Sequence, residues 1–188
     1  MNDESHLIEA ALQGETAAFG ELVQRYQDRL YSAVVHILGS RSDAEDVVQD
    51  AFIQAYVKLE TFKQNSRFYT WLYRIAFNVS ISRRRRRRIE ISVDEGREIS
   101  GSEPVDDGAA PGARLEEQER REQLELAMSQ LTYEHREIIV LRHMEDFSYE
   151  EIAEVLEISV GTVRSRLHRA RASLLEHLRE IMPDGPDE

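Results

Sequence analysis

The 188-residue sequence has no cysteine and no apolar run long enough to span a membrane. The absence of cysteine excludes a disulfide scaffold, a thiolate metal site and a cysteine nucleophile, and it fits a reducing compartment. The first residues, MNDESHLIEAALQG, are acidic and contain no long apolar segment. We therefore expect a cytoplasmic protein with no membrane insertion.

Strand patterns are also missing, because apolar residues recur at steps of three and four rather than two. Between residues 90 and 112 this periodicity stops, and Gly, Pro, Ser, Asp and Glu dominate, which is typical of a flexible linker. The expected fold class is all-α, with two small helical domains joined by a flexible acidic linker. The predicted parts are a first domain (1–88), the linker (89–113), a second domain (114–182) and a disordered tail (183–188).

The chain has fewer basic residues (24 Lys and Arg) than acidic ones (36 Asp and Glu), and its formal net charge is −12. Its distribution is uneven: Arg83–Arg88 are six consecutive arginines, and five more arginines lie between residues 164 and 179. Residues 89–125 instead hold twelve acidic residues against four arginines. The basic segments favour a nucleic-acid partner, whereas the overall negative field weakens binding to DNA. We therefore expect DNA binding that depends on a partner.

The segment 148–178 predicts a helix-turn-helix. Ser148 and Glu151 form a capping box for a first helix, and Ser159 is a suitable N-cap for a second one. The second helix has an apolar face made of Val160, Val163, Leu167, Ala170, Leu174 and Leu178. Its other side is polar and basic, as in a helix that enters the DNA major groove. The alternative is a helical hairpin whose basic face is simply solvated.

Three helices are predicted in the first part of the chain: Leu7–Leu12, Thr16–Leu38 with Gly39 as a stop signal, and one from a Ser42–Glu45 capping box to about Leu59. The third helix carries a stripe of carboxylates opposite its apolar face, made of Asp43, Asp46 and Asp50 with Gln49 beside them. A solvated face and a docking face for a basic partner both fit this stripe. A metal site fits poorly, because histidine partners and a second carboxylate motif are missing.

A further helix, Phe68–Ser82, has an inward face that includes Phe68 and Trp71. Tyr69, Tyr73 and Phe77 do not fit that face, so they are predicted to point away from the core. Outward aromatics next to an arginine run suit a surface on which single-stranded bases stack. The alternative is that these rings pack against another helix.

Three segments in order resemble the extracytoplasmic-function (ECF) group of the sigma-70 family of bacterial RNA polymerase sigma factors. They are DAEDVVQDAFIQAY, FKQNSRFYTWLYRIAFN with the arginine run after it, and SYEEIAEVLEISVGTVRSRLHRAR. The resemblance implies a non-enzymatic initiation factor without cofactor or metal, which binds core RNA polymerase through its β and β′ subunits. It also implies recognition of promoter −10 and −35 elements, strand opening, and an anti-sigma factor as a further partner.

The resemblance assigns expected roles to residues of this chain. The segment expected to bind polymerase contains Asp43, Asp46, Gln49, Asp50 and Phe52. The segment expected to recognise and melt the −10 element contains Phe62, Ser66, Phe68, Tyr69, Trp71, Tyr73, Arg74, Phe77, Asn78, Arg83, Arg84 and Arg85. At the −35 element, Arg164, Ser165, His168 and Arg169 are expected to face bases, with Thr162, Arg166 and Arg171 nearer phosphates.

Glu157 departs from the family pattern, which commonly has glycine at this turn position; if the residue is left-handed, glutamate costs about 1 kcal/mol there. Two other classes of function fit only parts of the sequence. A stand-alone helix-turn-helix regulator explains the second domain but not the aromatic helix before the arginine run. An all-α metal-dependent enzyme using Asp43, Asp46 and Asp50 lacks the second aspartate motif that it needs.

Overall fold

The computed structural model describes residues 3–63, 65–93 and 113–182, with side chains at all of these except 87–93 and 113–117. These residues form α-helices and short helical turns without any strand, which confirms the predicted all-α class. The chain divides into two compact units, residues 1–100 with 154–157, and residues 101–153 with 158–188. No helix in the described ranges is long and apolar enough to cross a membrane.

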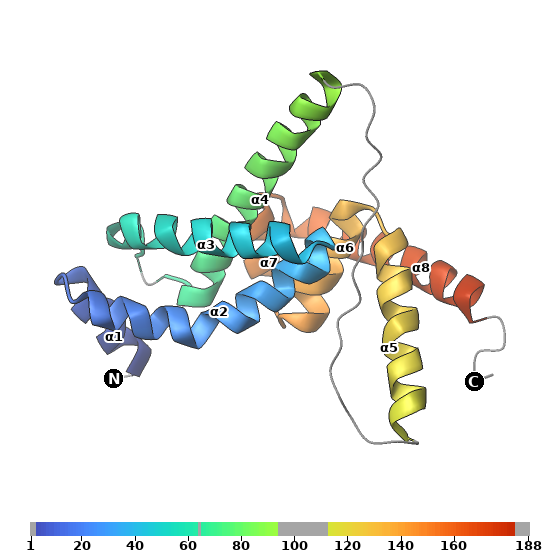
Figure 1. The fold of residues 1–188 in the computed structure, drawn as a ribbon, viewed down its shortest axis with the longest axis horizontal. Helices are drawn as coiled ribbons and strands as arrows, with labels where there is room; N and C mark the ends of the chain where they lie inside the picture. Colours follow the sequence, from blue (N-terminus) through green and yellow to red (C-terminus); the bar gives the residue numbers. More distant parts are fainter. Residues whose placement is uncertain (1–2, 64, 94–112, 183–188) are drawn as a thin grey trace. The chain divides into compact units, whose positions relative to one another are not determined.

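Apart from 154–157, the described residues of the first unit form α-helices and one 3-10 turn (Figure 1). In chain order these are α1 (Asp3–Leu12), α2 (Thr16–Leu38), α3 (Arg41–Val57), η1 (Leu59–Thr61) and α4 (Phe68–Val93). α3 packs against both α2 and α4, while α1 packs on α2. α3 can approach its neighbours closely because three of its inward residues, Ala44, Ala51 and Ala55, are small and fully buried.

The junction between α2 and α3 differs in part from its prediction. Gly39 has a φ of 67° and donates its N–H to the carbonyl of Val35, so the predicted helix stop is confirmed. The predicted Ser42 capping box is wrong. Ser40 is the N-cap instead, and its side chain accepts a hydrogen bond from the Asp43 N–H at 3.3 Å. The left-handed glycine turns the chain so sharply that α3 begins two residues earlier than the sequence motif indicates.

α4 is longer than the predicted helix 68–82 and continues to Val93. Arginine is a good helix former, and the residues from Arg83 to Val93 include neither Gly nor Pro. The first five residues of the predicted linker 89–113 therefore belong to a helix. The rest of that linker up to residue 112, and the predicted disordered tail 183–188, lie outside the described residues.

The second unit is built on one long helix. Its elements are α5 (Ala113–Gln130), α6 (Tyr133–Ile139), the π-helical turn η2 (Val140–Met144), residues 149–153 of α7 (Tyr149–Leu156) and α8 (Val160–Ile181). Both α5 and α6 pack on α8, which buries Val163, Leu167 and Ala170. The guanidinium of Arg136 donates to the carbonyls of Met128, Ser129 and Leu131 at the end of α5, so it satisfies acceptors that a helix end leaves open.

The caps predicted for the helix-turn-helix are confirmed, and Thr132 caps α6 by accepting from the His135 N–H. Ser159 accepts from the Thr162 N–H at 3.0 Å. The Ser148 hydroxyl accepts from the Glu151 N–H at 3.1 Å, and the Glu151 carboxylate accepts from the Ser148 N–H at 2.9 Å. These reciprocal bonds define where α7 begins.

Glu157 lies in the turn between α7 and α8 and has a φ of 54°. The residue is thus left-handed, as its family position suggests, and the side chain costs about 1 kcal/mol relative to glycine.

The Ser40 cap can be tested by replacing Ser40 with alanine. Because the Asp43 N–H then loses its acceptor, Ser40→Ala is expected to lower the free energy of unfolding by about 0.5–2 kcal/mol. Urea denaturation followed by circular dichroism measures this change. Ser42→Ala is the matched control, and equal losses for both variants would contradict the assignment of Ser40 as the cap.

Candidate nucleic-acid and partner-binding surfaces

The carboxylate stripe of α3 lies on the surface of the first unit. Asp46 and Gln49 are exposed, and Asp43 and Asp50 are half-buried. Phe52, which was predicted in the same binding segment, is 8% exposed and belongs to the core. The helical period explains the division, because Phe52 belongs to the buried row of α3 while the carboxylates lie outside that row.

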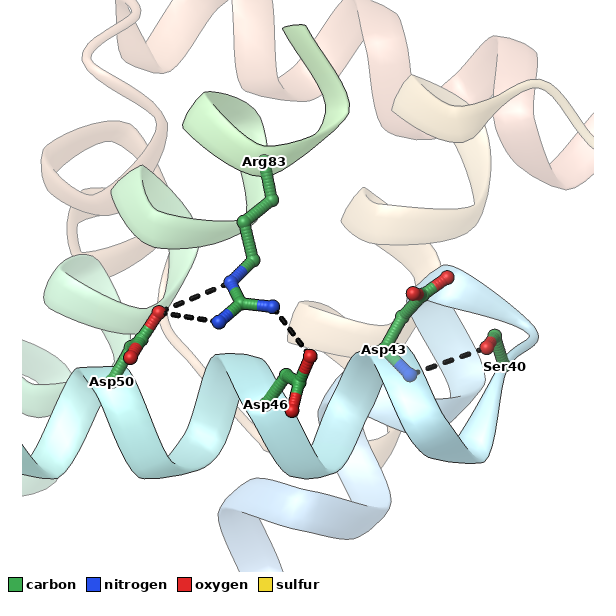
Figure 2. A network of polar contacts seen from close by, with 5 residues as sticks. All are labelled: Ser40, Asp43, Asp46, Asp50 and Arg83. Carbon is green, nitrogen blue, oxygen red and sulfur yellow. Dashed lines mark hydrogen bonds and ion pairs between the residues drawn. The ribbon is translucent and has the colours of Figure 1, made fainter. Parts of the chain in front are cut away.

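Arg83 of α4 reaches this stripe and binds two of its carboxylates (Figure 2). Its Nε and Nη2 atoms donate to Asp50 Oδ2 at 3.1 and 2.6 Å, and its Nη1 atom donates to Asp46 Oδ2 at 2.7 Å. The hydrogen bond to Asp50 is the largest cause that raises the pKa of Arg83 above its ordinary value. The contact joins a residue predicted to bind DNA to two residues predicted to bind polymerase, a pairing that the helical periodicity does not reveal.

An aromatic cluster fills the junction between η1 and α4. The ring centroids of Phe62 and Phe68 are 5.5 Å apart, and that of Trp71 lies 5.3 Å from Phe62 and 5.6 Å from Phe68. All three side chains are buried. They therefore shape the loop before α4 instead of forming its exposed surface.

The prediction that Tyr69, Tyr73 and Phe77 all point away from the core is wrong for the two tyrosines. Tyr69 is 4% and Tyr73 is 2% exposed, whereas Phe77 is half-buried. For Tyr69, the reason is that side chains of α2 cover its ring. Tyr26 stacks on the Tyr69 ring with centroids 5.4 Å apart, and the Arg29 guanidinium carbon lies 4.1 Å from the centroid of that ring.

The accessible part of the predicted −10 segment is polar and basic. Asn78, Arg84 and Arg85 are exposed, and Ser66 and Arg74 are half-buried. With Phe77, these side chains are the ones that a nucleic-acid strand could reach. A strand bound here would meet cations and one aromatic ring before it met the buried cluster.

α8 presents the predicted basic face of the helix-turn-helix. Arg164, Ser165, His168, Arg169 and Arg171 are exposed, while Thr162 and Arg166 are half-buried. The helical period of α8 thus places the predicted base-facing side chains on the surface, opposite the buried row that packs on α5 and α6. Such a face can enter a major groove, where arginine binds guanine with two hydrogen bonds.

Two arginines of this face make polar contacts with side chains of α6 and η2 that the sequence motifs do not indicate. Arg166 Nη2 lies 3.4 Å from the carboxylate of Glu134 on α6. Arg171 Nε donates to His143 Nε2 at 3.2 Å. These contacts orient both side chains along the edge of α8, and no periodic signal could have found them, because the partners are far away in the sequence.

The contact between Arg171 and His143 has an electrostatic consequence. Although His143 is an exposed residue, partial burial of its ring lowers its pKa below the ordinary value, and the positive charges of Arg171 and Arg142 lower it further, against an opposing effect of Asp146. The neutral imidazole is the form that can accept the hydrogen bond from Arg171. Among the described residues, no group of three or more His, Cys, Asp or Glu side chains is placed to hold a metal ion.

Two family models match the chain, one in each unit. The model of sigma-70 region 2 matches residues 22–89, and the model of sigma-70, region 4, matches residues 121–174. The chain is 36% identical over 181 residues to the ECF RNA polymerase sigma factor SigW of Bacillus subtilis strain 168, covering 93% of this chain and 96% of that protein. It is also 36% identical over 173 residues to the ECF RNA polymerase sigma-E factor of Escherichia coli K12, covering 89% and 90%.

Two solved structures have a similar fold. The sigma factor RpoE of Bartonella quintana, in complex with the anti-sigma factor NepR, has a TM-score of 0.72 and 26% identity, covering 89% of this chain and 98% of that one. CnrH, in complex with the cytosolic domain of CnrY, has a TM-score of 0.66 and 31% identity, covering 95% and 99%.

The lowered pKa of His143 predicts a pH dependence of stability. As pH falls through the ordinary histidine value of about 6.5, the unfolded chain takes up a proton that the folded chain resists, so stability decreases until His143 is protonated in both states. NMR titration of the histidine rings should find the pKa of His143 below 6.5. Arg171→Ala should raise this pKa only part of the way, because burial is the larger cause.

Arg169→Ala is the control for this titration, since it removes the same charge from the same helix but not from the contact with His143. If Arg171→Ala left the pKa of His143 unchanged, or if both variants raised it equally, the described contact would not be the cause.

Proposed function

This chain belongs to the ECF group of the sigma-70 family, and on that premise we propose that it is a promoter-specific transcription initiation factor. It binds core RNA polymerase and directs the enzyme to promoters by recognising −10 and −35 elements and promoting strand opening. The observation that carries this proposal is the order of the two family segments, region 2 over 22–89 and region 4 over 121–174. Each segment bears a surface whose charge suits its role.

The polymerase-binding surface in this proposal is the carboxylate stripe of α3, formed by Asp43, Asp46, Gln49 and Asp50. Acidic side chains on an otherwise well-packed helix suit a basic surface on the β′ subunit, with β as a second contact. Phe52 acts indirectly, because its buried ring holds α3 against the core. Electrostatic attraction of this kind increases the rate of association and selects the partner.

The −10 element is read by the segment from Phe62 to Arg85. The exposed side chains of Asn78, Arg84 and Arg85, together with Ser66, Arg74 and Phe77, contact the displaced strand through its bases and phosphates. The buried rings of Phe62, Phe68, Tyr69, Trp71 and Tyr73 hold the loop and α4 in the conformation that receives the strand.

The −35 element is read by α8 in the major groove. Arg164, Ser165, His168 and Arg169 face base edges, and each bidentate arginine–guanine pair is worth about 1–3 kcal/mol of discrimination. Thr162, Arg166 and Arg171 lie nearer the phosphates, where they set the register of the helix without reading sequence.

The protein acts by binding alone, without enzymatic turnover, and it works in the cytoplasm with the polymerase. An anti-sigma factor is a further partner, since the solved relatives RpoE and CnrH are both complexes with a second protein and NepR is named as an anti-sigma factor. A stand-alone helix-turn-helix regulator is not favoured, because it leaves the region 2 match unexplained.

The proposed function is tested by transcription in vitro from a random promoter library, using purified bacterial core polymerase with and without this protein. Transcripts that require the protein should share two sequence boxes upstream of their start sites. If the protein binds duplex DNA but leaves the polymerase without new start sites, the stand-alone regulator replaces this proposal.

A variant of α8 separates the two boxes in the same assay. Arg169→Ala should relax the upstream box at one or two positions, with a loss of about 1–3 kcal/mol in discrimination, and leave the downstream box unchanged. Arg179→Ala, in the last turn of the same helix, is the matched control and should leave both boxes intact. Loss of both boxes in Arg169→Ala alone would contradict the assigned role.

A further inference from the structure

Arg83 lies in the segment proposed to contact −10 DNA, yet its guanidinium is directed at α3 (Figure 2). Arg83 is four residues after Val79, which is buried, and so it continues the row of α4 that faces the core. Arg84 and Arg85 point elsewhere and are exposed. The helical period thus separates Arg83 from the arginines that follow it.

The three hydrogen bonds to Asp46 and Asp50 use all three nitrogens of the Arg83 guanidinium. A phosphate or a base would need the same donors in the same forked arrangement. These bonds occupy three of the five N–H donors of Arg83, among them the Nε–Nη2 pair that Asp50 binds. DNA must therefore compete with the two carboxylates for this fork.

The ion pairs of Arg83 with Asp46 and Asp50 also lie where another cation can replace Arg83. The side chains of Arg83, Asp46 and Asp50 are 39%, 56% and 42% exposed. Ion pairs between groups this exposed are weak, because water and salt compete for both charges. A second cation that approaches Asp46 and Asp50 from solvent could take the place of Arg83 without opening the core.

We propose that Arg83 is an internal counterion of the carboxylate stripe of α3. Docking of a basic polymerase surface on this stripe displaces the Arg83 side chain, which is then free to bind −10 DNA. This inference rests on the proposed function. Docking then has two electrostatic effects on DNA binding. It neutralises carboxylates that repel phosphates, and it adds one free guanidinium to the DNA-binding segment. Polymerase binding and DNA binding are thereby coupled through one side chain.

Core-polymerase affinity is the first test, measured by fluorescence titration of the labelled full chain. Arg83→Ala leaves Asp46 and Asp50 without their internal competitor, so the dissociation constant should fall by about two- to tenfold at low salt. Arg86→Ala is the matched control; it removes the same charge from an exposed residue outside the proposed −10 segment, for which the described part of the chain shows no ion pair, and it should not tighten binding.

If Arg83→Ala weakens core binding, or leaves it unchanged while the fold is intact by circular dichroism, Arg83 is a structural brace and the inference is wrong. If the variant does not fold, Arg83→Lys takes its place. A lysine keeps the charge but lacks the fork, so a smaller gain in core affinity supports the inference and a loss overturns it.

The second test uses the free chain and single-stranded −10 DNA without polymerase. Asp46→Asn/Asp50→Asn should release Arg83 and strengthen DNA binding. General loss of negative charge also strengthens binding, so the same pair of substitutions is repeated in Arg83→Ala. The inference predicts that Arg83→Ala weakens DNA binding more in the Asn/Asn background than in the wild type, by about two- to tenfold. Equal effects in both backgrounds would overturn it.

The failure of this inference and the failure of the proposed function are distinguishable. If the wild-type chain does not direct polymerase in the library transcription assay, the proposed function fails. If it does direct polymerase, but Arg83→Ala changes neither core affinity nor the DNA-binding cycle, only the role of Arg83 is wrong.

Discussion

The packing of α3 between α2 and α4 is the interaction on which the first unit depends. α3 buries one continuous row that includes Ala44, Ala51 and Ala55, and small side chains in this row bring the neighbouring helices close. The opposite side of α3 therefore faces solvent, and its carboxylates form part of the protein surface. The same packing brings α4 near enough for Arg83 to reach Asp46 and Asp50.

In both units, carboxylates of the same unit partly neutralise basic side chains. Arg83 is held by α3 carboxylates in the first unit, and Arg166 lies beside Glu134 in the second. With a net charge of −12, the chain has a field that repels phosphates except near its arginine clusters. This arrangement suits a factor that binds DNA as part of a larger assembly.

Local patterns predicted the helices well, because each depends on residues close in sequence. The periodicity of α2 and α8, the stop at Gly39 and the caps at Ser148 and Ser159 are all of this kind. What the pattern could not predict depends on distant neighbours. Tyr69 is buried because Tyr26 of α2 stacks on its ring, and the pairing of Arg83 with Asp46 and Asp50 joins residues more than thirty positions apart. The roles of the site residues remain predictions.

The dependence of DNA binding on polymerase is tested most directly by the affinity for a −10 non-template strand, measured by fluorescence anisotropy for the chain alone, core polymerase alone and the complex of both. We predict weak, sequence-independent binding by either component and tight binding by the complex, with a scrambled −10 strand bound far less well. Binding of the −10 strand by the chain alone, as tight and as selective as that of the complex, would contradict this dependence.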